Sequence, residues 1–459
     1  MEMRPLTLQK IAEIMDGTFF GPPAKLDTPV TAVVRDHRDV IPGSLFFCFP
    51  GERVDGHDLA PDAFAAGALC AVSERVLEVA DESYILVPST SLALKQLAKY
   101  YRSLFSIPVV GVTGSVGKTT TKEMIASVLG KRYTILKTQG NLNNEIGVPL
   151  TLLSLREHHE IAIVEMGISE FGEMHRLAEM VRPDICVITA IGRSHLEYLG
   201  DLQGVLRAKS EIFEFMSPDA LAILNGDDEY LSSLRLSMRK TTFGFRKEND
   251  FYADQETFSG KDEMSFRIWS PNGCVHACVH SFGKHLIAAS LAASAVGHSL
   301  GLTQDEILSG LCDYAPVGGR SNICETEYIT IIDDCYNANP DSVAVGLQSL
   351  ATLPGRHVAI LGDMKELGEH EEDFHREIGL TAAKSGLHCL ICCGKAAEYI
   401  YAGGLSDTGM EVWYFPEKEE LFAALPSLIR KDDTVLVKAS HSMRFEEIVS
   451  ELKCLGIES

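Results

Sequence analysis

One stretch of the chain, VVGVTGSVGKTTTKEMIASVL from position 109, limits the possible folds more than any other. An apolar run leads into a loop that contains two glycines, and the pattern of a helix begins at Gly117. Glycines let backbone N–H groups turn toward a phosphate, and the N-terminus of the following helix adds positive potential at the same point. A strand that leads through such a loop into a helix is typical of a parallel sheet with crossover helices. We therefore predict an α/β domain that binds phosphate at this loop.

The loop is a shorter variant of the common phosphate-binding pattern. The pattern G-x-x-x-x-G-K-[ST] requires glycine at position 112, where this chain has Val112, and the match is instead to T-G-x-x-G-K-T-T. Lys118 would supply a positive charge, and a threonine hydroxyl would reach Mg²⁺. The predicted phosphate contacts are Gly114, Ser115, Val116, Gly117, Lys118, Thr119 and Thr120.

The rest of the chain alternates short apolar runs with amphipathic helices, and we divide it into three domains. Residues 1–88 form a small α/β domain, residues 89–315 a central parallel-sheet domain, and residues 316–459 a second doubly wound, Rossmann-like domain. The runs IAIVEMG, ICVITAIG and ALAILNGD are predicted strands of the central domain. Between about residues 240 and 282 the pattern changes, and we expect a small antiparallel insert with a turn at Pro-Asn-Gly.

Composition excludes several classes of partner. The 459 residues include 41 Lys or Arg and 64 Asp or Glu, and the net charge of −23 argues against nucleic acid and anionic membranes. No signal peptide is evident at the start, and the apolar stretch 286–300 is too short for a membrane span. Cys389 and Cys392 form a C-x-x-C inside an apolar run, with no second pair to complete a zinc site, so we interpret them as core residues. We expect a reduced, cytoplasmic monomer.

Two side chains at predicted strand ends are candidates for a magnesium site. Glu165 closes the run IAIVEMG, and His195 follows the next strand in AIGRSHLEYLG. Because the carboxyl ends of parallel strands meet at one edge of a sheet, both would lie near the phosphate loop. A carboxylate at the end of a neighbouring strand is a usual ligand of nucleotide-bound Mg²⁺.

Lys209 stands in the apolar stripe of the predicted helix LQGVLRAKSEIFEFM, residues 202–216. A buried lysine without a partner is costly, so a lysine at this position needs an explanation. Burial lowers the pKa of a lysine, and the resulting free amine can add CO₂ to become a carbamate, which is an anion. Alternatively, the side chain extends out of the stripe to solvent.

Together these motifs resemble the Mur ligases of bacterial cell-wall synthesis across nearly the full chain. The stretches that carry the resemblance are TGSVGKTTTKEMI, TQGNLNNEIGVPLTLL, VEMGISEFGEM, SHLEYLG with AKSEIF, DDCYNANPDS, LGDMKELGE and VLVKASHSMR. The resemblance implies that the first domain binds the UDP end of the substrate, the central domain binds ATP, and the third closes over both. It also implies ATP-driven amide formation through an acyl phosphate, joining D-alanyl-D-alanine to UDP-N-acetylmuramoyl-tripeptide in cytoplasmic peptidoglycan precursor synthesis.

The resemblance also assigns roles to individual residues. Lys118 and the loop would bind the β- and γ-phosphates, while Thr119, Glu165 and His195 would serve two magnesium ions. Lys209 matches the lysine that relatives carry as a carbamate, and this group would hold magnesium. The remaining implied ATP contacts are His285, Arg320, Asp334 and Asn337. The implied substrate contacts are Asp36 and Arg38 with the GERVDGH stretch, and Asn141, Asn143 and Asn144, of which Asn144 ranks first.

The chain departs from the family pattern at three places. Asp36-His37-Arg38 replaces D-S-R, and Lys438-Ala439-Ser440-His441 replaces K-G-S-R. In GKHLIAAS, Leu286 and Ala289 occupy the asparagine positions of the family helix near the adenine, so looser nucleotide selectivity is expected.

Two other readings stay open. The nearest is a sister ligase that adds one amino acid, either diaminopimelate or lysine, or a folylpolyglutamate synthetase; the absence of D-N-P-R and the presence of DDCYNANPDS favour the dipeptide-adding type. The other is a regulatory protein that keeps the fold without the chemistry, and the intact set of site residues argues against it.

Overall fold

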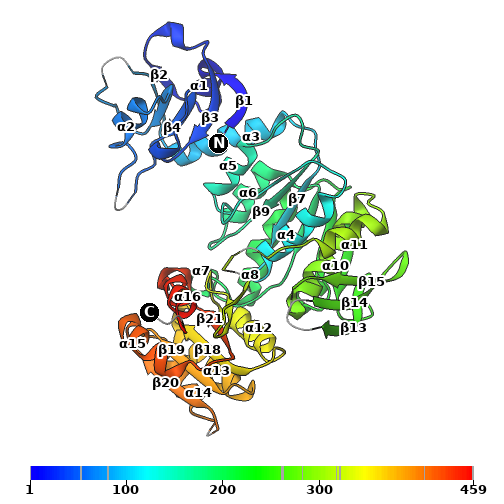
Figure 1. Cartoon of the computed structure of the whole chain (residues 1–459). Coiled ribbons are helices and arrows are strands. Elements are labelled where there is room, and N and C mark those ends of the chain that lie inside the picture. The colour runs from blue at the N-terminus through cyan, green and yellow to red at the C-terminus, as the bar shows by residue number, and fades with distance from the viewer. Residues whose placement is uncertain are drawn as a thin grey trace.

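The computed structural model describes residues 2–51, 54–79, 82–259, 263–281, 283–316, 318–319, 322–407 and 409–456. Three α/β domains follow one another along the chain, blue, then cyan to green, then yellow to red in Figure 1. Their sheets have six, nine and six strands within the described residues. No helix in these ranges is long and apolar enough to cross a membrane.

The N-terminal sheet has the order β1-β3-β4-β5-β6-β2. Its four inner strands are parallel, and the two edge strands are antiparallel to their neighbours. The strands and helices of this region are β1 (Glu2–Thr7), α1 (Leu8–Ile14), β2 (Thr18–Phe20), β3 (Pro29–Val34), β4 (Ser44–Phe47), α2 (Ala60–Ala65), β5 (Cys70–Ser73), β6 (Tyr84–Leu86) and α3 (Thr90–Ser103).

The central sheet has the order β15-β14-β13-β12-β11-β10-β7-β9-β8. β7 lies between β9 and β10 and is parallel to both, so the sheet reverses its winding at β7, where ligands of open α/β sheets bind. The elements are β7 (Val109–Thr113), α4 (Lys118–Leu129), β8 (Ile135–Lys137), α5 (Gly147–Leu153), β9 (Ile161–Glu165), α6 (Glu173–Val181), β10 (Ile185–Ile188), α7 (Leu196–Leu199), α8 (Leu202–Ser210), β11 (Leu221–Asn225), α9 (Glu229–Ser232), β12 (Arg239–Gly244), β13 (Phe251–Ser259), β14 (Glu263–Ser270), β15 (Gly273–Val279), α10 (Lys284–Ser299) and α11 (Gln304–Cys312).

The C-terminal sheet has the order β16-β17-β21-β18-β19-β20, with only β16 antiparallel among the described strands. The doubly wound prediction for this domain is therefore confirmed. The elements are β16 (Asn322–Glu325), β17 (Thr330–Asp333), α12 (Pro340–Leu350), β18 (Arg356–Gly362), α13 (Glu371–Lys384), β19 (Cys389–Cys393), α14 (Ala397–Gly404), β20 (Glu411–Phe415), α15 (Lys418–Leu428), β21 (Asp433–Lys438) and α16 (Glu446–Lys453).

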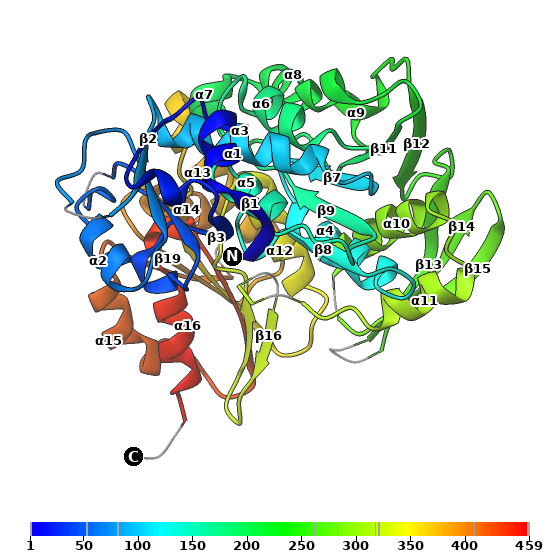
Figure 2. The same ribbon diagram turned by 90° about the horizontal axis from the view of Figure 1, so that it is seen from above.

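The N-terminal and central domains share one continuous apolar core. Leu94, Leu97 and Tyr101 of α3 belong to the same buried cluster as Leu45 of the first sheet and Leu152 of α5. Helix α3 thus joins the two sheets, as Figure 2 shows from above. The C-terminal sheet has separate cores on its two faces.

Three sequence predictions can be compared with particular elements. The antiparallel segment is confirmed, with its turn between β14 and β15, but it extends the central sheet because β13 pairs in parallel with β12. Cys389 and Cys392 are fully buried in β19, which confirms their interpretation as core. The helix expected over residues 202–216 ends at Ser210 and continues as a 3₁₀ turn, where the Glu211 carboxylate accepts hydrogen bonds from two backbone N–H groups at the start of α6.

Candidate active site

The glycine loop connects β7 to α4 in a conformation that needs its glycines. Gly117 has φ +80° at the N-cap of α4, and Gly114 has φ +146°. A Cβ atom on Gly114 would lie 1.9 Å from Thr189 Oγ1, so a side chain does not fit there. Lys118 folds back and donates from Nζ to the Gly114 carbonyl at 2.7 Å. The predicted phosphate loop therefore has the required shape, with the lysine held over it.

Thr119 and Glu165 meet at the carboxyl edge of the sheet. The Thr119 hydroxyl donates to both Glu165 oxygens at 2.9 Å, and the Asn143 amide donates to Oε1 at 2.8 Å. Glu165 is fully buried, and the backbone register sets it beside Val112 of β7. A hydroxyl and a carboxylate next to a phosphate loop are the oxygen donors that Mg²⁺ prefers, so these residues fit a magnesium ion.

Lys122 completes this cluster and was missed from the sequence. It is fully buried, its Nζ lies 3.5 Å from Glu165 Oε2 and 3.0 Å from Glu123 Oε1, and it donates to the Thr138 carbonyl at 2.8 Å. It lies one turn of α4 after Lys118 on the same helix face, and this i, i+4 spacing is the signal that could have found it.

Lys209 is buried in α8, with a side chain that is 1% exposed. Burial, together with the positive charge of nearby Lys118, holds the pKa of Lys209 well below its usual 10.5. Within the part of the chain that the structure describes, no hydrogen bond or ion pair holds its ammonium group. The side chain therefore does not reach solvent, which rules out the alternative of an extended surface lysine. The charge of Lys118 acts on it, which shows that the amine is near the phosphate loop, but Lys209 is not among the residues that line the cavity there.

His195 lies at the N-cap of α7 and reaches the C-terminal domain. Its φ is +56°, and its Nδ1 pairs with Glu366 Oε2, which lowers the pKa of Glu366. Beside it, Arg193 bridges to Asp341 at 2.7 Å and to Glu377 at 2.8 Å. The segment after β10 therefore joins the central and C-terminal domains at the edge of the site.

A cavity of about 630 Å³ lies between these two domains. Its central-domain wall includes the loop, Glu165 and His195, and its C-terminal wall includes Asp334, Asn337 and Lys438. Lys438 is 4% exposed and pairs with Asp334 Oδ2 at 2.6 Å, because β17 and β21 are neighbours and end together. The importance of Lys438 was not foreseen from the sequence.

The apolar end of this cavity contains residues from α10 and β12. Ala288, Ala289 and Phe243 line it, next to His285. His285 Nδ1 is buried without a hydrogen-bond partner, and burial lowers the pKa of this histidine. A ring nitrogen without a hydrogen-bond partner, beside apolar walls, is a suitable contact for a nucleotide base. Arg320 lies outside the described residues.

The three predicted asparagines have different surroundings. Asn143 and Asn144 line the cavity, whereas Asn141 is exposed and is not among its lining residues. Asn144 Oδ1 accepts from the backbone N–H groups of Ile146 and Gly147 at 3.2 and 2.9 Å, so it fixes the start of α5.

A second cavity, of about 720 Å³, lies where the N-terminal domain meets the central domain. Arg35, Asp36, Glu74, Thr90 and Ile146 are among its lining residues. Thr90 starts the long helix α3, and a helix N-terminus attracts anions. Arg38 is exposed and pairs with Asp36 at 2.5 Å, which holds the pKa of Asp36 far below its usual value; Arg38 is not among the lining residues.

The chain matches known proteins over nearly its whole length. Three family models match it: the Mur ligase catalytic domain over residues 29–102, the Mur ligase middle domain over 112–297, and the Mur ligase glutamate ligase domain over 319–441. UDP-N-acetylmuramoyl-tripeptide–D-alanyl-D-alanine ligase of Bacillus subtilis is 37% identical over 452 residues, 97% of this chain and 98% of that protein.

Two solved structures are similar throughout. A MurF from Acinetobacter baumannii superposes with a TM-score of 0.90 at 30% identity, covering 99% of this chain and 100% of that one. A MurF ligase from Thermotoga maritima in complex with ADP gives a TM-score of 0.82 at 29% identity, covering 92% of this chain and 98% of that one.

Proposed function

The chain belongs to the Mur ligase family, and from that premise we propose that it joins D-alanyl-D-alanine to UDP-N-acetylmuramoyl-tripeptide at the expense of ATP. The observation that carries the proposal is the single cavity to which the glycine loop, Glu165, His195, Asp334 and Lys438 all contribute. Two domains supply this lining, so their closure assembles the site.

The reaction has two steps. A carboxylate oxygen of the tripeptide attacks the γ-phosphorus of ATP, and the bond between this phosphorus and the β,γ-bridging oxygen breaks. The products are ADP and the acyl phosphate of the tripeptide. The amine of D-alanyl-D-alanine then attacks the acyl carbon, the bond to phosphate breaks, and the amine loses a proton as the amide forms. Both partners in the first step are anions, so positive charge at the phosphates lowers the barrier.

The residues of the chain supply this charge and exclude water. Lys118 and the N-terminus of α4 face the phosphates, and Lys438 adds a cation from the opposite wall. Thr119 and Glu165 would hold Mg²⁺, which neutralises charge on the transferred phosphoryl group when bound. The contacts of Arg193 and His195 with the C-terminal domain would help to hold the two domains together over the substrates, and exclusion of water there would protect an acyl phosphate from hydrolysis.

We extend the proposal to a carbamate on Lys209. A buried amine without a partner, next to a second lysine, is unstable as a cation and reactive as a free base. Addition of CO₂ forms a nitrogen–carbon bond and releases one proton, and the product is an anion that Lys118 attracts. The carbamate would position magnesium, with His195 and Glu165, as part of a two-ion site.

The residues that line the two cavities suggest the remaining binding roles. The apolar end beside His285 would take adenine, and Asp334 and Asn337 would lie near the ribose and phosphates. The cavity at Asp36 and the start of α3 would take the UDP end. We place the domain boundaries near residues 88 and 315 and the reaction in the cytoplasm.

An assay of phosphate release tests the function directly. Purified protein receives ATP, Mg²⁺ and UDP-N-acetylmuramoyl-tripeptide, and release is measured with D-alanyl-D-alanine or with single amino acids as the amine. We expect release only with tripeptide and dipeptide together. Turnover with one amino acid would favour the sister ligases, glutamate-dependent turnover on a folate would favour a folylpolyglutamate synthetase, and ATP binding without turnover would favour a regulatory protein.

A further inference from the structure

The edge strand β15 carries a row of metal-binding side chains on one face. The strand and His280 directly after it have the sequence GCVHACVH, and alternate side chains of a strand point to the same face. Ala277 and Val279 are buried in the core of the central domain. Cys278 and His280 therefore share the opposite face, where Cys278 is half-buried and His280 is exposed.

Helix α11 ends beside this face and adds a second thiol. Cys312 is its last residue, and its Sγ lies 3.2 Å from His280 Nε2. One ligand atom from each of Cys278, His280 and Cys312 lies within 4.8 Å of the other two. Ligand atoms around a tetrahedral zinc ion lie roughly 3.5 Å apart, given zinc bonds of about 2.0–2.3 Å, so small side-chain rotations would close this triangle on an ion.

A carboxylate also lies near the other ring nitrogen of the histidine. Strands β14 and β15 pair Ser265 with Cys278, and the same register brings Glu263 opposite His280. Glu263 Oε2 lies 3.9 Å from His280 Nδ1, on the ring nitrogen that does not face the thiols. A carboxylate on the far nitrogen orients the ring and makes the ligating nitrogen more basic.

Without a bound cation, the local charges do not suit the thiols. Cys312 stands at the C-terminus of α11, where the helix dipole disfavours an anion and favours a cation. A dipositive ion would compensate both thiolates.

We propose that Cys278, His280 and Cys312 form a binding site for Zn²⁺, with Glu263 supporting the histidine. Binding forms two zinc–sulfur bonds and one bond to Nε2 and releases two thiol protons. Soft thiolates with one imidazole select zinc over magnesium or calcium, and water would complete the four ligands.

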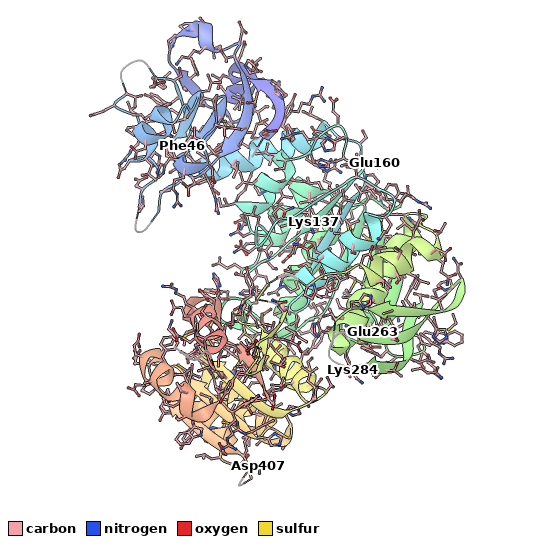
Figure 3. The ribbon with its side chains drawn as sticks, in the orientation of Figure 1. Phe46, Lys137, Glu160, Glu263, Lys284 and Asp407 are labelled. Atoms are coloured by element: carbon pink, nitrogen blue, oxygen red, sulfur yellow. The ribbon has the colours of Figure 1, made fainter. Side chains whose placement is uncertain are left out.

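The site stands apart from the reaction centre and would act on stability. None of its residues lines either of the two cavities of the active site. Strands β14 and β15 and helix α11 lie on the side of the central domain away from the N-terminal domain in both views, and Figure 3 labels Glu263 there. β15 is an edge strand of the central sheet, and the ion would tie it to α11.

Zinc uptake by the reduced, tag-free, full-length protein tests the proposal. After dialysis against a zinc chelator, we expect the protein to regain one tightly held zinc ion that Cys312→Ser and His280→Asn lose. Glu263→Gln should weaken binding about 10–100-fold. Co²⁺ in place of zinc should give the absorption of a tetrahedral thiolate complex, and zinc should raise the melting temperature only where Cys312 is present.

The same strand offers matched controls. Cys274→Ser and His276→Ala change exposed residues of the same kinds outside the cluster, and both variants should keep the ion. Phosphate release at the unaltered rate shows that each variant is folded. Any zinc that binds at the magnesium site is present in all variants, so it does not change the difference in zinc content between them. No difference in zinc content between the parent protein and Cys312→Ser would overturn the proposal, as would a Cys278–Cys312 disulfide that forms in place of metal binding.

Discussion

Two lysines of the central domain are equally buried but have opposite surroundings. Lys122 on α4 is 0% exposed and Lys209 on α8 is 1% exposed. Two carboxylates and a carbonyl surround the ammonium group of Lys122. Lys209 has no such partner among the described residues, and the like charge of Lys118 acts on it.

The comparison shows that burial alone does not identify a reactive lysine. A buried cation with good partners stabilises a structure once it is folded, while a buried amine without partners is either neutral or modified. The first lysine holds Glu165 in place, and the second is a buried amine without a partner that lies near the like charge of Lys118. Four predictions test whether this division of roles is correct.

The largest effect is expected from Lys122→Met. This change leaves the Thr138 carbonyl and the buried Glu165 carboxylate without their cation, and removing one partner of a buried pair costs about 3–5 kcal/mol. Urea unfolding followed by tryptophan fluorescence and circular dichroism measures the loss. Lys209→Met is the matched control and should not lower the free energy of unfolding. Equal losses in the two variants would contradict the comparison.

Lys209→Ala should reduce the rate of phosphate release about 10²–10³-fold, the usual cost of removing one preorganised electrostatic group. If the carbamate positions magnesium, a small carboxylate such as acetate should restore part of the rate, and added bicarbonate should raise the rate of the parent enzyme after CO₂ depletion. Lys99→Ala, a change of an exposed lysine on α3, is the control. Full activity of the Lys209→Ala variant would refute the proposed role.

A moderate effect is expected on the pH dependence of stability. The pKa of Lys209 is lower in the folded chain than its usual 10.5, so between those two values the unfolded chain binds one more proton. The free energy of unfolding of the parent protein should therefore rise with pH across this window, relative to Lys209→Met. In CO₂-free buffer, the advantage of the variant should be largest near neutral pH and vanish as pH approaches 10.5. If the difference in free energy of unfolding between the two proteins stayed constant from neutral pH to 10.5, burial would not be lowering the pKa of Lys209, and the prediction would be wrong.

The smallest effect is expected from Glu366→Gln. Its partner His195 lies in another domain, and the carboxylate is 42% exposed, so the pair should contribute no more than about 1 kcal/mol. Thermal unfolding measures this, and Glu369→Gln, a change of an exposed carboxylate three residues along the chain, is the control. A loss as large as that of Lys122→Met would mean that domain contacts, rather than buried partners, dominate the stability of the site.

Much of the candidate active site follows from local sequence. The glycine loop, Glu165 at a strand end and Lys209 in an apolar stripe could each be identified because strand ends gather at one sheet edge and helix periodicity is regular. Asn144 shows the limit: its residue type suits a substrate contact, but its Oδ1 caps α5, and only the path of the backbone reveals this. Arg38 is similar, since its charge is taken up by Asp36.

The zinc-binding cluster shows the limit more strongly. Cys278 and His280 lie two residues apart at the end of β15, but Cys312 belongs to helix α11, and the sequence contains no spacing pattern that joins them. The C-x-x-C at Cys389 has the more familiar spacing and is fully buried in a strand. Spacing patterns find sites within one turn or hairpin, not sites between elements that meet only after folding.

The amino-acid sequence by itself determined the phosphate loop, the α/β class, the family and the burial of Lys209, because each of these depends on residues close together along the chain. The tertiary structure alone decided which buried lysine has partners, how Asp334 and Lys438 face the loop across a cavity, and which cysteines meet. These depend on contacts between residues that are far apart in the chain, and the geometry of such contacts is set by the packing of whole domains.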